Sequence, residues 1–598
     1  MKFLDKKEIN ISVIKDKAKD IFNKAKKLAV KKQFYIPAAA VIVLIAAAIG
    51  ILSIDSVRYS MRDWVNLHFP DKLPYYVYYE NNVPHYNIDE VDFDKNDVRE
   101  VQVGNNRKYL INHSRGFALG FKRDAEFDFS AAQEYISVKC SDMDIVVSKE
   151  YSTYATAQET KAFIKDYLHK YLLNEKYMQH NKITLHKDAV EKIGNFWVQM
   201  VAISRTPAPD SNVKYNTYVY CYIYTDSTMF YRIMFKAADY NDELLEEVYR
   251  TLYSFSTDVK VRGVSGTFTD FKPVIPKNWS DETKKFYNDL VNSDSCKWGV
   301  YVPHAVVNND FTEINKLENE LGETFDGLIE YRYYFEDMPV EGMKKAYEKG
   351  KTLELTIQTS TVMNGDLDSY NPVFDILDGR YDWRFRVMAH QIKEVGHPVL
   401  LRLNNEMNSD WTSYGSSACL DDPSIYVELW RKIYDIFTEV GVDNAIWIFN
   451  PNDESFPPCG YNSSMAFYPG DEYVQVFGVT GYNTGTYYDE LNGEKWKTFS
   501  EIYDNIMTKH HHVYDNFPWI ITEFASSSIG GDKVQWINDM FRDLKKYKNI
   551  KMAFWFNSAD LDERPEFAGA VARPYWLDET PETAKAFSDG LRQSKKGD

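Results

Sequence analysis

The chain has 598 residues and a formal net charge of −18, with 44% hydrophobic and 15% aromatic residues. This length predicts more than one domain, because single hydrophobic cores rarely grow past roughly 250–300 residues. The acidic balance leaves no broad basic surface to neutralise phosphates, which argues against nucleic acid as a partner. The five cysteines are few and lack the CxxC spacing of metal sites.

The N-terminal region predicts a membrane anchor. Residues 1–33 are rich in lysine, and residues 34–54 then run without a single charge. About 20 apolar residues span a bilayer, and the basic flank stays on the cytoplasmic side. We therefore expect a cytoplasmic tail at 1–33, a transmembrane helix at 34–54 and an extracellular remainder. A cleaved signal peptide is the alternative, but its basic region would be unusually long and its apolar core too extended.

Residues 55–256 predict an extracytoplasmic α+β domain. Strand-like runs precede a helix over 155–171, further strands follow, and a second helix covers 242–252. This order of elements is typical of an α+β sandwich, and it resembles the Mog1/PsbP-like fold. We find no catalytic constellation in this region and expect a spacer or a binding module.

The C-terminal half predicts a (β/α)8 TIM barrel over residues 296–598, preceded by a linker at 257–295. Amphipathic helical stretches separate most of eight apolar runs of strand length, at 298–302, 327–333, 353–359, 399–403, 445–449, 474–480, 519–522 and 551–556. Continuous apolar runs are typical of parallel strands buried on both faces, and a barrel accommodates eight of them. An open doubly wound sheet is the alternative, but no GxGxxG turn follows the first strand.

Two glutamates stand where apolar strands give way to polar residues. Glu406 ends the fourth strand and Glu523 ends the seventh. Both should point to the open face of the barrel where such enzymes keep their chemistry. Retaining glycosidases use one carboxyl group as nucleophile and another as acid/base, with pKa values that keep one ionised and the other protonated. A salt-bridge role is the alternative for a single strand glutamate, and the presence of a pair disfavours it.

The barrel region, over about residues 297–592, resembles glycoside hydrolase family 26, the β-mannanases and related β-glucanases. The resemblance rests on ordered motifs: GRYD at 379–382, GHPVLLR at 396–402, EMN at 406–408, WIFNPN at 447–452, YPGD at 468–471, GYN at 481–483, TEF at 522–524 and WFN at 555–557. It implies retaining hydrolysis with Glu406 as acid/base and Glu523 as nucleophile. It also implies a hydrogen bond from Tyr482 to the nucleophile and a sugar-stacking floor formed by Trp555.

One residue departs from the family pattern. A histidine usually precedes the acid/base glutamate of the family, whereas this chain has Asn405. In the broader clan of retaining barrel glycosidases an asparagine here contacts the sugar 2-hydroxyl. Mannose carries that hydroxyl axially and glucose equatorially, so the choice between mannan and glucan stays open.

Four further residues are candidates for substrate binding. Asn408 and Trp411 follow the acid/base and match the family pattern. Arg402 is expected beneath the carboxylates, where it keeps the nucleophile ionised or forms a purely structural ion pair. His304 follows the first strand and either touches substrate or is an ordinary surface histidine.

The two cysteines Cys419 and Cys459 follow successive barrel strands, so both should lie on loops of one face. A disulfide between them is one hypothesis and two buried free thiols are the other.

The sequence thus predicts a membrane-anchored, extracellular bacterial endo-β-glycanase that needs no cofactor or metal. Its expected substrate is a β-1,4-linked mannan or glucan type of polysaccharide, cleaved by double displacement. An anchor of this kind suits trimming of a surface or exported exopolysaccharide beside the machinery of polysaccharide synthesis or export. The alternative is a non-catalytic polysaccharide-binding scaffold with a decayed barrel.

Overall fold

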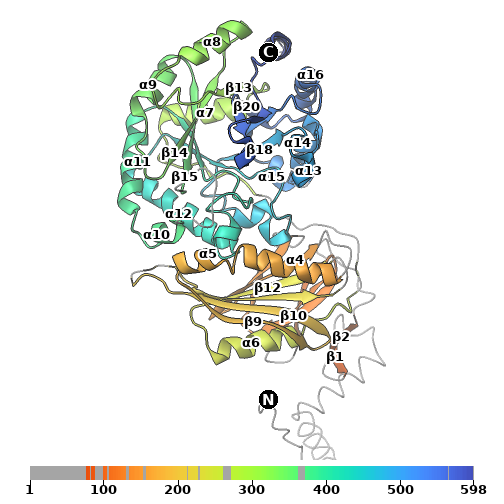
Figure 1. Cartoon of the computed structure of the whole chain (residues 1–598). Helices are drawn as coiled ribbons and strands as arrows, with labels where there is room; N and C mark the ends of the chain where they lie inside the picture. Colours follow the sequence, from red (N-terminus) through yellow and green to blue (C-terminus); the bar gives the residue numbers. More distant parts are fainter. Residues whose placement is uncertain are drawn as a thin grey trace, which may run out of the picture. The chain divides into compact units, whose positions relative to one another are not determined.

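The computed structural model of the chain describes its sheets, its helices and most of the connecting loops (Figure 1). The described residues are 76–80, 83–87, 98–103, 107–128, 134–151, 157–209, 211, 213–225, 229–259, 261, 271–360, 371–508, 510–562 and 564–596. The tail predicted at 1–33 and the transmembrane helix predicted at 34–54 lie outside these ranges. Within them, no helix is long and apolar enough to cross a bilayer.

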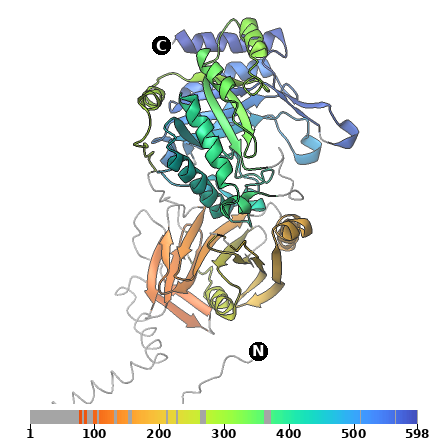
Figure 2. The same cartoon turned by 90° about the vertical axis from the view of Figure 1, so that its left-hand side faces the viewer.

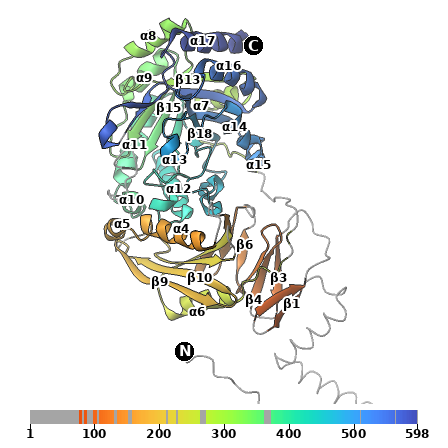
Figure 3. The same cartoon turned by 45° about the vertical axis from the view of Figure 1, so that its right-hand side comes forward.

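Five short strands near the N-terminus belong to a compact unit of their own. Strands β1 (Tyr76–Glu80) and β2 (Val83–Asn87) pair as a hairpin, and a three-stranded sheet contains β3 (Val98–Val103), β4 (Arg107–Asn112) and β5 (Phe117–Lys122) (Figure 3). These strands cluster apart from the sheet that follows, within the region predicted as one domain over 55–256.

A seven-stranded antiparallel sheet forms the α+β domain. Its strands lie in the order β6-β7-β8-β12-β11-β10-β9. They are β6 (Glu126–Asp128), β7 (Tyr135–Lys139), β8 (Met143–Tyr151), β9 (Ile183–Ile193), β10 (Phe196–Arg205), β11 (Thr217–Tyr224) and β12 (Met229–Ala237). Helices α4 (Ala157–Lys170) and α5 (Glu175–His180) lie on one face of the sheet and α6 (Asp242–Tyr253) on the other (Figure 1). Both predicted helices are present as α4 and α6, whereas β6, α5 and β9 were not predicted.

Eight parallel strands close into a barrel in the C-terminal half. They are β13 (Lys297–Tyr301), β14 (Gly327–Tyr333), β15 (Thr352–Gln358), β16 (Val399–Leu403), β17 (Ala445–Phe449), β18 (Val476–Asn483), β19 (Trp519–Ser526) and β20 (Ile550–Phe556). The pairing of β20 with β13 closes the barrel. All eight predicted runs coincide with these strands. Two strands end later than expected, so Tyr482 and Glu523 lie inside β18 and β19.

Helices surround the barrel strands (Figure 2). They are α8 (Thr312–Leu321), α9 (Val340–Glu348), α10 (Val373–Leu377), α11 (Asp382–Val395), α12 (Pro423–Val440), α13 (Asp489–Asn492), α14 (Phe499–Thr508), α15 (His511–Tyr514), α16 (Lys533–Asp543) and α17 (Pro581–Lys596). A hairpin of β21 (Ala559–Leu561) and β22 (Val571–Pro574) follows the last barrel strand. The antiparallel sheet and the barrel belong to one compact unit, and a continuous apolar core contains side chains of both.

The segment predicted as a linker is in part a piece of the barrel. Helix α7 (Asp281–Val291) begins with Ser280 as its N-cap, whose side chain accepts from the Thr283 amide. The Trp279 indole donates to the carbonyl of Ala445, the first residue of β17, at 2.9 Å. Trp279 and Leu290 also join the apolar cluster of inward-facing strand residues such as Ile446. Residues 279–291 therefore close the end of the barrel where the strands begin.

This closure predicts that Trp279→Ala destabilises the barrel. Removal of a buried tryptophan costs about 3–5 kcal/mol, and Trp279 is 3% exposed. The free energy of unfolding, measured with denaturant, should fall by this amount. Trp383→Ala is the control, because Trp383 is 63% exposed on α11 and should change stability by less than about 0.5 kcal/mol. Equal losses for both variants would contradict the assignment.

Candidate active site

Three donors surround the carboxylate of Glu523. The hydroxyl of Tyr482 donates to Oε1 at 2.6 Å, as expected from the sequence. Arg402 Nη2 donates to Oε2 at 3.1 Å, and the hydroxyl of Tyr331 donates to the same oxygen. Hydrogen bonds to a charged carboxylate favour its ionised form. The three donors therefore converge on the Glu523 carboxylate on the inner face of the barrel.

Arg402 lies beneath Glu523 and has no exposed surface. Its Nη1 donates to Asn450 Oδ1 at 2.8 Å, and its Nε donates to Thr356 Oγ1 at 2.7 Å. A substrate cannot reach a side chain enclosed in this way. This corrects the substrate-binding role predicted for Arg402, which instead forms a buried ion pair with Glu523.

A third carboxyl group, Glu354 on β15, lies on the other side of Arg402. One of its oxygens is 2.8 Å from Arg402 Nε, although that N–H is directed to Thr356, and neither Glu354 oxygen accepts a well-aligned hydrogen bond. Burial raises the pKa of Glu354 to about 8, and the nearby guanidinium only partly opposes the rise. At neutral pH Glu354 is thus largely protonated, so the charge of Arg402 is directed to Glu523.

Glu406 follows β16 in a left-handed backbone conformation, with φ of 57°. Asn452 Nδ2 donates to its Oε1 at 2.9 Å, and Trp411 Nε1 donates to its Oε2 at 3.2 Å. Burial raises the pKa of Glu406 to about 7, and the negative charge of Glu523 adds to the rise. The bonds from Asn452 and Trp411 oppose it. Glu406 can thus hold a proton at neutral pH, as one member of a catalytic carboxyl pair must.

Asn405, the residue that departs from the family pattern, is held by its oxygen. Its Oδ1 accepts from Gln358 Nε2 at 3.0 Å and from the hydroxyl of Tyr414 at 3.2 Å. Since the oxygen is already engaged, the amide nitrogen is the group that Asn405 can offer to a sugar hydroxyl. A donor at this position agrees with the predicted binding role.

Two residues after Glu406 were predicted to bind substrate, and the structure contradicts this only for Asn408. Asn408 is 1% exposed, and its Nδ2 donates to the carbonyls of Asn452 and Glu454 and to the hydroxyl of Ser455. It shapes the loop after β17 and does not face a substrate, which corrects its predicted binding role. Trp411 is half-buried, its ring centroid lies 5.1 Å from that of Phe456 in a tilted arrangement, and its Nε1 donates to Glu406.

The predicted sugar-stacking floor is also corrected. Trp555 has no exposed surface, donates to the Tyr575 carbonyl, and packs against Trp536 and Phe587 of the outer helices. Neighbouring strand residues point to opposite faces, so the next residue, Phe556, faces inward. It lies 4.7 Å from the Tyr301 ring.

The remaining predicted residues lie apart from the carboxylates. His304 is exposed in the turn after β13, so its contact with substrate stays a prediction. Cys419 and Cys459 are both buried free thiols, which corrects the disulfide hypothesis. The Cys419 Sγ lies 3.9 Å from the Ser413 carbonyl oxygen. The thiol of Cys459 forms a side-chain hydrogen bond with Tyr461.

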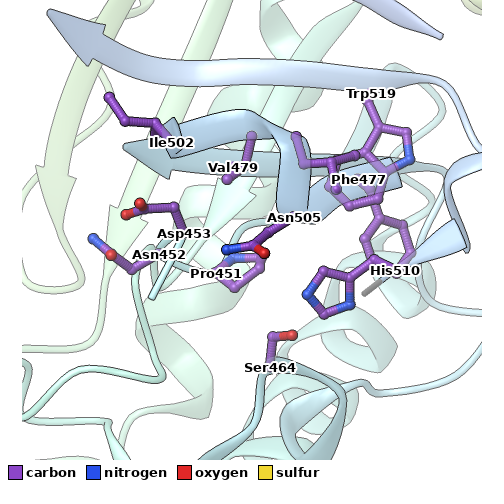
Figure 4. Close-up of a pocket in the computed structure, with 11 residues that line it drawn as sticks. Pro451, Asn452, Asp453, Ser464, Phe477, Val479, Ile502, Asn505, His510 and Trp519 are labelled. Atoms are coloured by element: carbon purple, nitrogen blue, oxygen red, sulfur yellow. The ribbon is translucent and has the colours of Figure 1, made fainter. Parts of the chain in front are cut away.

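Sequence reasoning missed Tyr331, Asn452 and Glu354 as parts of the site. Tyr331 alternates with Tyr333 on its strand, and the sequence does not show which face of the strand looks inward. Asn452 belongs to the WIFNPN motif, and Glu354 interrupts an apolar strand, so both carried a signal. Asn452 also lines a small cavity behind the site with Asp453 and His510 (Figure 4). The residues lining this cavity include neither Glu406 nor Glu523, so it is separate from the carboxylate pair.

Residues 357–508 match the model of glycosyl hydrolase family 26. The barrel is therefore similar to this family over that segment. The matched segment contains Arg402, Glu406 and Tyr482 but ends before Glu523, so the place of Glu523 in the site rests on the geometry described above.

Two curated relatives and a solved structure are similar to parts of this chain. Endoglucanase H of Acetivibrio thermocellus is 34% identical over 191 residues, which are 31% of this chain and 20% of that protein. A mannan endo-1,4-beta-mannosidase of Bacillus subtilis is 34% identical over 110 residues, 17% of this chain and 29% of that protein. The chain thus spans less than a third of either relative. The structure of Bacillus subtilis mannanase man26 covers 53% of this chain and 93% of its own, with 18% identity and a TM-score of 0.35.

The buried carboxyl groups predict that stability falls as pH rises. Burial raises the pKa of Glu354 to about 8 and that of Glu330 to about 7 from the ordinary 4.5. The folded state then binds more protons than the unfolded state, so this contribution is complete below about pH 4.5 and is lost as pH rises through the folded pKa values. The melting temperature should be higher near pH 5 than at pH 8, and Glu354→Gln should flatten the decline.

Glu313→Gln is the control for this experiment, because Glu313 is exposed on α8 with 71% of its side chain accessible. It should leave the pH dependence of the melting temperature unchanged. A decline as steep in Glu354→Gln as in the wild type would show that Glu354 is not the titrating group.

Proposed function

We propose that the chain is a retaining endo-β-glycanase that cleaves a β-1,4-linked mannan or glucan type of polysaccharide by double displacement. The observation that carries the proposal is the contrast between the two carboxyl groups. Glu523 accepts from three donors, one of them a guanidinium, whereas burial raises the pKa of Glu406 to about 7. The similarity of the barrel to family 26 supports the same reaction class.

In the first step, a Glu523 oxygen attacks the anomeric carbon as the bond from that carbon to the leaving oxygen breaks. The proton of Glu406 passes to the leaving oxygen, and a glycosyl ester forms on Glu523. In the second step, Glu406 removes a proton from water, the water oxygen attacks the anomeric carbon, and Glu523 leaves as a carboxylate. Tyr331, Tyr482 and Arg402 stabilise that carboxylate before and after the reaction.

The substrate is proposed as a class, mannan or glucan, for two reasons. The curated relatives are named as an endoglucanase and as a mannan endo-1,4-beta-mannosidase. The Asn405 amide replaces a histidine at the position that meets the sugar 2-hydroxyl, and an amide can donate to either epimer. We further propose an extracellular, membrane-anchored enzyme that trims a surface or exported polysaccharide, on the basis of the lysine-rich stretch at 1–33 and the uncharged run at 34–54.

The first test is product release from mannan, glucomannan, mixed-linkage glucan and carboxymethylcellulose by the wild type and by Glu523→Gln. The amide isostere cannot act as the nucleophile, so release should fall to background, while the exposed-site control Glu313→Gln should keep full activity. The first product seen by NMR should have the β configuration of the substrate. Full activity in Glu523→Gln would disprove the assignment, and glycan binding without release by the wild type would favour a scaffold.

The second test concerns the acid/base. Because Glu406 must be protonated for the first step, kcat/KM should fall as pH rises through about 7. Asn452 donates to Glu406 and lowers its pKa, so Asn452→Ala should move this decline to higher pH. Glu406→Ala should reduce kcat on a polysaccharide by about 10²–10⁴-fold. A decline at the same pH in wild type and Asn452→Ala would contradict the assignment of Glu406.

A further inference from the structure

The loop from Asn404 to Asp422, which carries Glu406 and Trp411, contacts the antiparallel sheet along its second half. The hydroxyl of Tyr177, from α5, donates to the Ala418 carbonyl at 3.0 Å. The hydroxyl of Tyr220, from β11, donates to the Leu420 carbonyl. Both tyrosines are buried and pack in the continuous core that contains Leu420. The contact is thus a built interface between the α+β domain and the barrel.

Charged groups are buried in this interface. Arg232 of β12 is 1% exposed, and its Nη2 donates to the Asp421 carbonyl at 2.7 Å and lies 3.7 Å from the Asp421 carboxylate. Its guanidinium stacks on the Tyr461 ring at 3.8 Å. Lys236 pairs with Asp422 at 3.2 Å. Buried charges are tolerated only in well-defined geometry with their partners, so these pairs fix how the loop meets the sheet.

A second loop of the site is held in the same way. Residues 450–468 include Asn452, which donates to Glu406. In this loop the amides of Gly460 and Tyr461 donate to the Glu150 carboxylate of β8 at 2.6 and 3.3 Å. A Cβ atom at Gly460 would stand 2.5 Å from the Glu134 carbonyl oxygen. The two loops that supply both donors to Glu406 therefore rest on the same sheet.

The α+β domain also contacts Asp410, the residue directly before Trp411. The hydroxyl of Tyr171, directly after α4, donates to Asp410 Oδ2, and Lys170 lies 3.5 Å from the same carboxylate. The next residue is Trp411, whose Nε1 donates to Glu406 Oε2. The path from the α+β domain to the carboxyl group thus runs through one hydrogen bond, one peptide unit and a second hydrogen bond.

We propose that the α+β domain is a positioning element of the active site, in which Tyr171 holds Asp410 and thereby fixes Trp411 against Glu406. The domain was expected to be a spacer or binding module, and this assignment gives it a role in the reaction itself. The inference rests on the proposed function, because it concerns the acid/base of that reaction.

The positioning has a direction that can be measured. The groups that face Glu406 are Glu523, Arg402, Asn452, Trp411 and Tyr414. Of these, the bond from Trp411 stabilises the ionised form. A loosened Trp411 therefore raises the pKa of Glu406 further and keeps it protonated to higher pH. On the other side, the partners of Asp410 are Tyr171 and Lys170.

The test compares the full-length wild type with Tyr171→Phe, which removes one hydroxyl and keeps the ring. The high-pH decline of kcat/KM on the β-glycan that the enzyme cleaves should move up by about 0.3–1 pH unit. In hydrogen exchange, peptides covering 406–414 should exchange about five-fold faster, as expected for the loss of one hydrogen bond. Tyr253→Phe, at an exposed tyrosine of α6, should change neither quantity.

A second pair of variants tests the same contact from the loop. Asp410→Asn keeps an acceptor for Tyr171 and should behave like the wild type, because the exposed pair with Lys170 contributes little. Asp410→Ala removes the acceptor and should reproduce the effects of Tyr171→Phe. Identical behaviour of the two Asp410 variants would overturn the proposal.

The outcomes separate this inference from the proposed function. If Tyr171→Phe leaves the exchange of 406–414 unchanged, or speeds it without moving the pH profile, the positioning role is wrong. If the wild type cleaves no β-glycan, the proposed function fails. The exchange measurement alone then decides, with faster exchange in Tyr171→Phe and Asp410→Ala supporting the contact and unchanged exchange overturning it.

Discussion

The buried guanidinium of Arg402 is the interaction on which the site depends. It has no contact with solvent and pairs with the carboxyl groups of Glu354 and Glu523. Burial raises the pKa of Glu354, so this group carries little charge at neutral pH. The remaining negative charge is that of Glu523, so the ion pair directs it to the face where a substrate would bind. The same negative charge is felt by Glu406 and helps it to hold its proton. One enclosed cation thus separates the protonation states of two groups that share a site.

The second constraint is the support of the loops after β16 and β17. Neither loop has regular secondary structure beyond short 3-10 turns, and such loops are mobile when nothing holds them. Here their polar backbone groups are satisfied by side chains of a separate sheet, including a buried arginine and a buried glutamate. The sheet therefore takes the part that a rigid scaffold plays for catalytic loops in general.

The barrel and its two glutamates were predictable because their signals are local. A strand buried on both faces reads as an apolar run, and a polar residue at its end stands out. Side-chain direction was less predictable, since a shift of one residue along a strand reverses its face. That reversal explains why Trp555 was assigned to the site although Phe556 faces it. The substrate-binding role predicted for Asn408 was wrong for another reason. An asparagine in a loop can form hydrogen bonds with the backbone as readily as with a ligand.

The contacts between the sheet and the barrel could not be foreseen from either segment. Tyr220 and Arg232 lie in strands whose pattern is that of ordinary core and surface residues, and their partners are about 190–200 positions away in the chain. Residues 279–291, which close the end of the barrel, were predicted as part of a linker because their composition resembles that of one. Glu354 did carry a signal, since a carboxyl group within an apolar strand requires a partner.

The backbone of Glu406 adds a consequence for how such a site persists. Its φ of 57° lies in the left-handed region, which costs a residue with a side chain roughly 1 kcal/mol relative to glycine. Its carboxyl group is also buried beside another anion. Replacement by glycine would remove both the backbone strain and the buried carboxyl group. Mutations that stabilise the fold would therefore tend to replace this residue. Folding stability therefore does not account for this residue, which agrees with the acid/base role proposed for it.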